Sequence, residues 1–238
     1  MPYAIGTLNK KLHSAIAFLD YLAARGHIPK SLAEVLQPVK MPRRLPLSVF
    51  QHEGIVKALE AIDTSNPLAY RDRTILELLY STAIRVSELT GLDAGSIDLR
   101  GGSLKVLGKG SKERIVPVGK TALRFLETYV KAVRPFLLKH PDEKAVFLNS
   151  RGERISRNAV TIIVHRRCPV KAVGVNATSH TFRRSCATEL IKSNANLYHV
   201  KEFMGHESLD TLKRYVNLSE TEVKEMHSKC HPREKDEE

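Results

Sequence analysis

The chain has 238 residues, 42% of them hydrophobic, which is enough for one sizeable core and a small second unit. It has no run of about 18 apolar residues, and Lys10 and Lys11 stand where a secretory signal would need its apolar centre. We therefore expect neither membrane spanning nor export. Lys and Arg (38) outnumber Asp and Glu (26), and the net charge of +12 favours a polyanionic partner such as nucleic acid, although it could serve solubility alone.

The first fifth of the chain is predicted to be a short helical arm with a basic linker. Apolar residues recur at helical spacing from Leu8 to Leu22, and Gly26 is placed to end that helix. Extended backbone is expected after it, at Pro38, Pro42 and Pro46. We place a domain boundary there, with residues 1–45 as the arm.

The following segments predict mostly helix with one small sheet. Helices are expected at 48–62, capped by Ser48, at 71–83, and at 86–92. Residues 97–119 alternate between apolar and polar positions around glycine turns, which indicates three short antiparallel strands. A further helix is expected at 120–139.

The remaining segments continue this pattern. A brief strand and turn are expected at 145–156, and helices at 158–168, 180–192 and 196–205. Ser219 and Glu222 form a capping box that would begin a last helix. The predicted fold class is mainly α (α+β), a helical domain with a small three-stranded antiparallel sheet preceded by a short helical arm.

Metal and nucleotide sites find little support in the sequence. His227, Cys230 and His231 have metal-ligand spacing, but three ligands without a partner pattern are a weak zinc signal. No phosphate-binding loop of the form GxxxxGK[ST] occurs. The three cysteines cannot all pair within the chain, which favours a reducing cytoplasm. We expect no metal and no cofactor.

Several cationic and imidazole side chains stand beside the apolar helical faces: Arg85, Lys109, His180, Arg183 and His206. Each has an ordinary explanation by itself, as a surface arginine, a hairpin lysine or a capping histidine. Together they predict a cationic cage for a phosphate group. His180 and Arg183 share one side of a helix, and the guanidinium groups of Arg85 and Arg183 match the geometry of phosphate oxygens. Such a cage would neutralise the transition-state charge of a phosphodiester without a metal.

Tyr215 ends the stretch GHESLDTLKRY, nine residues after His206. It could be an ordinary half-buried aromatic residue. A phenol of pKa about 10 is a poor nucleophile unless a base and cations lie nearby. The cationic cage would provide both.

Four stretches in this order resemble the motifs of the tyrosine recombinases, also called the phage integrase family, and are close to its Xer-type members: LLYSTAIRVSELTGL, GKGSKERIVPV, HTFRRSCATEL and MGHESLDTLKRY. The resemblance covers the chain from about Pro46 to Leu218. It implies a catalytic domain at 46–218 that performs site-specific DNA recombination, as integration, excision or resolution. Alternatives are relaxation of DNA by a type IB topoisomerase, or a DNA-binding accessory protein without catalysis.

The resemblance also implies roles for single residues. Arg85 and Arg183 would hold the scissile phosphate, Lys109 would protonate the departing 5′ oxygen, and His180 would take the proton of the attacking phenol. His206 would hydrogen-bond the phosphate, Tyr215 would become a 3′-phosphotyrosyl ester, and Glu88 would help order the site. Contacts to double-stranded DNA are expected from Lys40, Arg43, Arg44, Lys112, Arg114, Arg184, Lys213 and Arg214.

Two departures from the family pattern concern single positions of one helix. Arg184 stands where a histidine is common, and Glu189 replaces the histidine of the usual ATHL. We expect tuning rather than loss of activity.

The remaining expectations concern the two ends of the chain and the location of the protein. The N-terminal core-binding domain of the family is expected to be shortened here, to residues 1–45. Residues 219–238 either fold back on their own domain or, as we favour, dock into a neighbouring protomer of a homotetramer through Val223 and Met226. The protein is expected in the cytoplasm, with the nucleoid and away from membranes.

Overall fold

The computed structural model describes residues 5–29, 36–40, 49–108 and 112–205. The chain forms two compact units, residues 1–46 and 47–238, and each is described by itself. No helix of the described ranges is long and apolar enough to cross a membrane.

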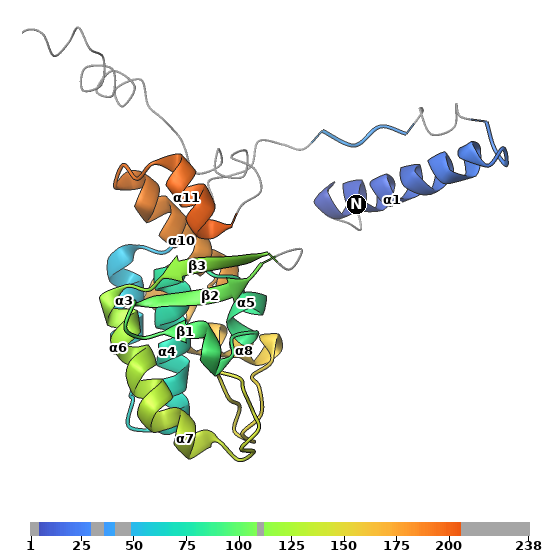
Figure 1. The fold of residues 1–238 in the computed structure, drawn as a ribbon. Helices are drawn as coiled ribbons and strands as arrows, with labels where there is room; N and C mark the ends of the chain where they lie inside the picture. Colours follow the sequence, from blue (N-terminus) through green and yellow to red (C-terminus); the bar gives the residue numbers. More distant parts are fainter. Residues whose placement is uncertain (1–4, 30–35, 41–48, 109–111, 206–238) are drawn as a thin grey trace, which may run out of the picture. The chain divides into compact units, whose positions relative to one another are not determined.

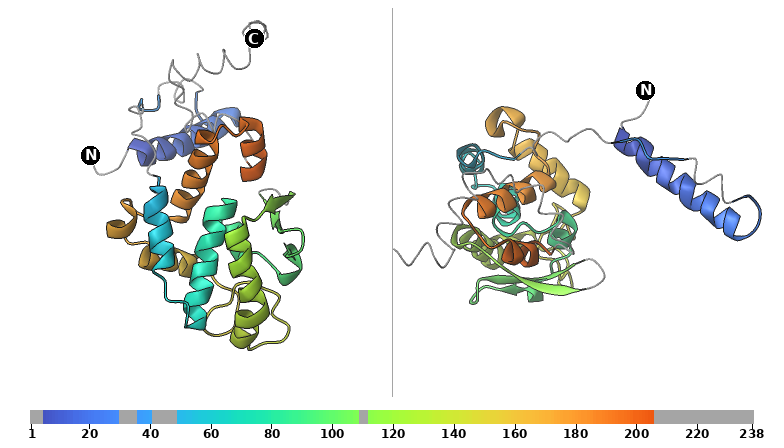
Figure 2. Two further views of the ribbon diagram at one scale, coloured as in Figure 1. Left: turned by 90° about the vertical axis from the view of Figure 1, so that its left-hand side faces the viewer. Right: turned by 90° about the horizontal axis from the view of Figure 1, so that it is seen from above.

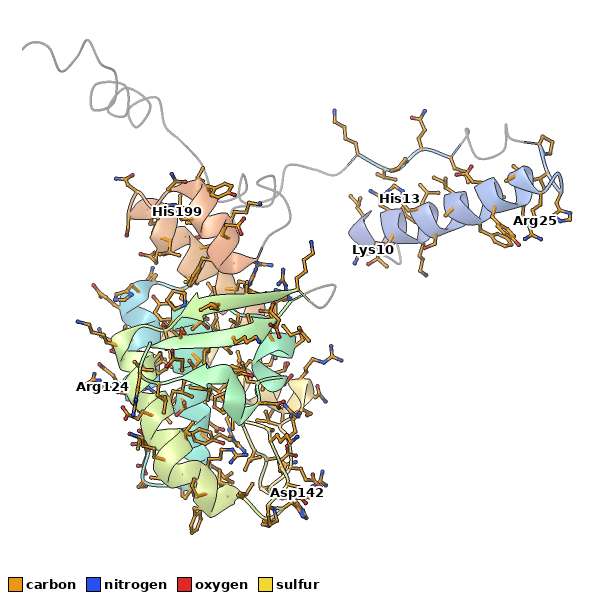
Figure 3. All side chains as sticks on the ribbon, in the orientation of Figure 1. Lys10, His13, Arg25, Arg124, Asp142 and His199 are labelled. Carbon is orange, nitrogen blue, oxygen red and sulfur yellow. The ribbon has the colours of Figure 1, made fainter. Side chains whose placement is uncertain are left out.

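The first unit contains one long helix, α1 (Ile5–Ala24), which confirms the predicted amphipathic helix. Gly26 follows with a φ of +73°, a left-handed conformation suited to glycine at a helix end. The side chain of Asn9 accepts from the backbone N–H of Val39 (3.0 Å) and donates to its carbonyl (2.8 Å), which ties residues 36–40 to α1. Figure 3 labels Lys10 and His13 on this helix and Arg25 just after its end, and no residue of the helix is buried.

The second unit is mainly helical (Figure 1). Its described helices are α3 (His52–Glu60), α4 (Pro67–Thr82), α5 (Val86–Thr90), α6 (Lys120–Thr128), α7 (Arg134–Leu137), α8 (Arg157–Arg167), α9 (Val170–Val173), α10 (Ser179–Lys192) and α11 (Leu197–Met204), with a 3-10 turn η1 (Ala94–Ser96) and a π-helical segment η3 (Tyr129–Val133).

Helix α4 lies at the centre of this unit. Asn66 caps it by accepting from the N–H groups of Leu68 (2.8 Å) and Ala69 (3.4 Å), and Pro67 occupies its first turn, where a missing N–H costs nothing. The helix packs against α6 and α10, and Figure 2 shows α4 and α6 side by side. Most of its residues from 69 to 79 are buried, so α4 is the core helix around which the site is built.

The sheet is three-stranded and antiparallel, in the order β1 (Ile97–Asp98), β2 (Ser103–Leu107), β3 (Glu113–Pro117), as predicted. Leu104 pairs with Val116, and both are buried, whereas Leu107 and Ile115 on the other face are exposed. This alternation follows from the two-residue period of a strand. It places the side chains of β3 alternately towards the core and towards solvent.

Five details differ from the sequence-based expectation. The helix expected at 71–83 begins four residues earlier, at Pro67, and the short helix α9 was not expected. The helix expected from Ser48 begins at His52 with Gln51 as its cap. Phe50, just before it, is buried in the core, and its backbone N–H donates to Oγ of Ser185 at 2.8 Å. Residues 145–156 form isolated bridges, Asp93 with Ala145 and Leu148 with Arg154, rather than a strand. The helix expected at 120–139 contains η3, where the backbone changes to π-helical hydrogen bonding.

Candidate active site

Arg85 lies between two helices of the core. Helix α4 ends at Thr82 and is followed by Ala83, which has a left-handed φ of 50°, and the chain then runs extended through Arg85 (φ −72°, ψ 152°) into α5. The Nη1 of Arg85 contacts Oε1 of Glu88 at 2.8 Å, and its Nη2 donates to the carbonyl of Gly205 at 3.1 Å. The Arg85 side chain remains 35% exposed, so an incoming group can reach it.

Glu88 is the buried counter-ion of this site. Its carboxylate accepts the backbone N–H of Arg85 at 2.7 Å and both terminal nitrogens of Arg114, at 2.9 and 3.0 Å. Burial alone would raise the pKa of Glu88, but the hydrogen bonds from Arg114 and Arg85 outweigh it and hold that pKa below its ordinary value of 4.5. Glu88 is therefore ionised at neutral pH and is shared by two guanidinium groups.

Arg183 is buried in α10 and reaches the ends of two other helices. Its Nη1 donates to the carbonyl of Ala83, and its Nη2 donates to the carbonyl of Met204. Both carbonyls lie at helix C-termini, where the helix dipole favours a cation. Arg183 thereby joins α4, α10 and α11, and α11 is further held to α10 by a small apolar cluster that includes Val200 and Met204.

His180 lies in the first turn of α10, three residues before Arg183, and is exposed. The helix begins there because Thr178 caps it, accepting from the N–H of Thr181 at 3.1 Å. Partial burial of the imidazole, and then the positive charges of Arg184, Arg183 and Arg85, lower the pKa of His180 below its ordinary value of 6.5. The imidazole is therefore neutral at pH 7 and able to accept a proton.

The structure thus brings together Arg85, Glu88, His180 and Arg183. Arg184 is adjacent to them in α10 and partly buried, while Lys112 is exposed just before β3. Lys40 belongs to the other unit. The other predicted site and DNA-contact residues lie outside the described residues: Lys109, His206, Tyr215, Arg43, Arg44, Lys213 and Arg214.

The weak zinc candidates His227, Cys230 and His231 also lie outside the described residues, as do Val223 and Met226 of the expected last helix. Within the described ranges, no group of three or more His, Cys, Asp or Glu side chains could hold a metal ion.

Residues 48–222 match the family model described as "Phage integrase family". The chain belongs to this family, the tyrosine recombinases. The matched range contains the positions of the six predicted catalytic residues, but not Lys40, Arg43 and Arg44 of the predicted DNA contacts.

Curated relatives of this tyrosine recombinase agree with the assignment. The tyrosine recombinase XerD of Staphylococcus epidermidis is 36% identical over 227 residues, which are 95% of this chain and 77% of the relative. XerD of Staphylococcus aureus is 35% identical over 217 residues, which are 91% of this chain and 73% of the relative. This level of identity over most of both chains makes the protein a site-specific recombinase of the tyrosine type.

Solved structures show the same fold at lower identity. The XerA recombinase matches with a TM-score of 0.64 at 20% identity, over 93% of this chain and 83% of that one. The Tn1549 transposon integrase, in complex with a circular intermediate DNA, matches with a TM-score of 0.74 at 17% identity, over 96% and 80%. The lambda integrase dimer bound to a core site matches with a TM-score of 0.69 at 18% identity, over 89% and 73%.

The site of this recombinase also uses groups that sequence reasoning missed. The carbonyls of Ala83, Met204 and Gly205 accept hydrogen bonds from the two arginines. Gly205 could have been recognised as a helix end, since it follows an apolar helical pattern. The bidentate pair of Arg114 with Glu88 has no comparable signal, because these residues are 26 positions apart on a strand and a helix.

Proposed function

We propose that this tyrosine recombinase cleaves and rejoins double-stranded DNA through a covalent 3′-phosphotyrosyl intermediate on Tyr215. The observation that supports it best is the convergence of Arg85 and Arg183 on the last turn of α11, with a neutral imidazole, His180, beside them. The two guanidinium groups suit the oxygens of a phosphodiester, and the imidazole provides the base that an attacking phenol requires.

Arg85 and Arg183 bind the scissile phosphate in this proposal. A guanidinium has five N–H donors, so Arg85 can keep Glu88 and the Gly205 carbonyl and still donate to a phosphate oxygen. Its 35% exposure leaves it open to DNA. Arg183 adds a second buried charge, which acts strongly because little water screens it.

The covalent step exchanges one phosphate ester for another. The Tyr215 oxygen forms a bond to phosphorus, the bond from phosphorus to the 5′ oxygen breaks, His180 takes the phenol proton, and Lys109 supplies a proton to the 5′ oxygen. His206 hydrogen-bonds the phosphate. Rejoining is the reverse reaction with a 5′-hydroxyl, and the retained ester energy makes an external energy source unnecessary.

The larger organisation is proposed on the same basis. Residues 1–45 form the arm, 46–218 the catalytic domain, and 219–238 a helix and tail that dock into a neighbouring protomer of a DNA-bound homotetramer. The basic residues predicted from the sequence contact the DNA backbone, and the protein acts with the nucleoid in the cytoplasm. The positive net charge of +12 supports a DNA partner.

A suicide substrate tests the chemistry. Duplexes that bind the protein are selected from a random library, and the selected site is nicked near its centre so that the short cleaved fragment is lost. We expect the wild-type protein to form a covalent complex that survives denaturant. Tyr215→Phe should form none, since it lacks the nucleophile, while its Kd for the same DNA stays within about threefold, less than 1 kcal/mol.

Three results would contradict the proposal. An undiminished covalent yield in Tyr215→Phe would show that another residue is the nucleophile, and no covalent complex in the wild type would indicate a binding protein without catalysis. Relaxation of a supercoiled plasmid without any preferred sequence would instead indicate topoisomerase activity.

A further inference from the structure

Glu88 is held from two sides, and one of its two guanidinium partners is more exposed than the other. Arg85 and Arg114 both contact Oε1, at 2.8 and 2.9 Å, and Arg114 also contacts Oε2 at 3.0 Å. The exposed fractions of the side chains are 35% for Arg85, 16% for Arg114 and 3% for Glu88. The carboxylate therefore lies between an open arginine and a largely enclosed one.

Arg114 forms the more rigid of these two contacts. Its two terminal nitrogens bind the two carboxylate oxygens in parallel, a geometry that fixes both planes. Arg114 stands on β3, whose pairing with β2 sets its backbone, whereas Arg85 stands in the short extended link before α5. Strand β3 can thus fix the orientation of Glu88, and Glu88 in turn fixes Arg85.

The same guanidinium also contacts the end of α11. A Cβ atom placed on Gly205 would lie 3.0 Å from Cζ and 3.0 Å from Nε of Arg114, so the absence of a side chain there allows this close packing. The carbonyl of Gly205 accepts from Arg85. Arg114 therefore supports both groups that Arg85 contacts, Glu88 and the last turn of α11.

We propose that Arg114 is a positioning residue, which orients Arg85 for phosphate through Glu88 and Gly205. This rests on the proposed function, in which Arg85 binds the scissile phosphate. A direct DNA contact, expected for Arg114 from the sequence, fits its surroundings less well. Both terminal nitrogens face Glu88, and within the described residues its Nε is a buried atom with no hydrogen-bond partner. Arg114 would have to leave Glu88 to reach a phosphate.

The two roles give different results in Arg114→Gln. A positioning residue affects the covalent step, so the rate of complex formation at saturating suicide substrate should fall about 100-fold, the scale that a misplacement of about 1 Å can cost. The slope of log K against log salt for DNA binding should not change. A phosphate contact would instead reduce that slope by about 0.9 and leave the saturated rate near that of the wild type.

Arg114→Lys keeps the charge but not the parallel pair of hydrogen bonds. We expect its saturated rate to lie between those of the wild type and Arg114→Gln, at least about tenfold below the wild type, with an unchanged salt slope. Arg124→Gln is the matched control, because Arg124 is exposed on α6 and remote from these contacts (Figure 3), and its saturated rate should equal that of the wild type.

The outcomes separate this inference from the function on which it rests. A wild-type protein without a covalent complex would overturn both. A wild-type protein that forms the complex, with an Arg114→Gln rate equal to it, would overturn only the role of Arg114. If Arg114→Gln does not fold, as judged by its thermal transition, Arg114→Lys decides, and a wild-type rate in that variant would overturn the proposal.

Discussion

At the scale of single residues, the proposed chemistry depends on the charges that surround one acidic side chain, Glu88, and one basic side chain, His180. Hydrogen bonds from two arginines keep Glu88 ionised despite its burial. Partial burial and three nearby guanidinium groups keep His180 neutral. The same cluster of positive charge therefore gives an anion that orders the site and a base that can accept a proton.

The lowered pKa of His180 predicts the pH dependence of cleavage. Protonated His180 cannot accept the phenol proton, so the cleavage rate at subsaturating DNA should rise with pH to a plateau. The pH of half-maximal rate should lie below 6.5, because the pKa of His180 is lowered. The pKa of Glu88 lies below its ordinary value of 4.5, so Glu88 stays mostly ionised above that pH. Single-turnover formation of the covalent complex between pH 4.5 and 8 measures this.

The variant His180→Ala tests whether His180 causes the fall in rate at acidic pH, the acidic limb of the profile. His180→Ala should lower the plateau rate about 10²–10⁴-fold, the usual contribution of a general base, and should remove the limb. A midpoint at or above 6.5, or a limb that persists in His180→Ala, would show that another group controls the pH dependence.

At the scale of elements, α4 carries both the core and a buried ionic cluster. Asp72 is fully buried, and its Oδ1 contacts Arg71 at 2.7 Å while its Oδ2 contacts Arg166 (2.7 Å) and Arg167 (3.1 Å) at the end of α8. Arg71 also donates to the carbonyl of Leu148 at 2.8 Å. One carboxylate thus joins α4, α8 and the bridged segment around residue 148.

Removal of that carboxylate should destabilise the fold strongly. Asp72→Asn leaves three guanidinium groups facing one another, and we expect the free energy of unfolding to fall by about 3 kcal/mol, the low end for a broken buried ion pair. The low end applies because Arg166 is 57% exposed and can rehydrate. Urea denaturation measures the change.

The matched control is an exposed pair. Asp93 contacts Arg154 at 2.5 Å, but the two side chains are 48% and 39% exposed, so Asp93→Asn should cost less than about 1 kcal/mol. Equal losses in the two variants would contradict the structural role of the buried cluster.

At the scale of the whole molecule, the surplus of positive charge is the property that matters for binding. The chain of 238 residues has a net charge of +12, and the cations expected to contact DNA are spread along the sequence from Lys40 to Arg214. Such a distribution predicts binding to the DNA backbone at many points rather than at one.

Salt should therefore weaken DNA binding steeply. If about six phosphates are neutralised, log K should fall linearly with log salt with a slope of about −5. Fluorescence anisotropy of a labelled random-sequence duplex, titrated at several salt concentrations, measures the slope. A flat response would mean that the basic residues do not form the DNA-binding surface.

The sequence alone predicted the elements that depend on local pattern. The apolar period of α4 and the alternation in β2 and β3 act within a few residues, so the body of α4 and the three-stranded sheet were predicted correctly, whereas the start of α4 at Pro67 and its cap at Asn66 were missed. The four motifs also indicated the family, because their residues keep their order and spacing along the chain. The roles of all the site residues stay predictions: Arg85, Glu88, Lys109, His180, Arg183, His206 and Tyr215.

Only the tertiary structure decided how the site is held. Glu88 and Arg114 are 26 positions apart, and Arg85 and Gly205 are 120 apart, so no local pattern reports their contact. The start of α3 at His52 and the bridges around residues 145–155 also depend on long-range packing. Residue type and spacing fixed which chemical groups this protein has, whereas packing between distant segments determined which of them share one carboxylate.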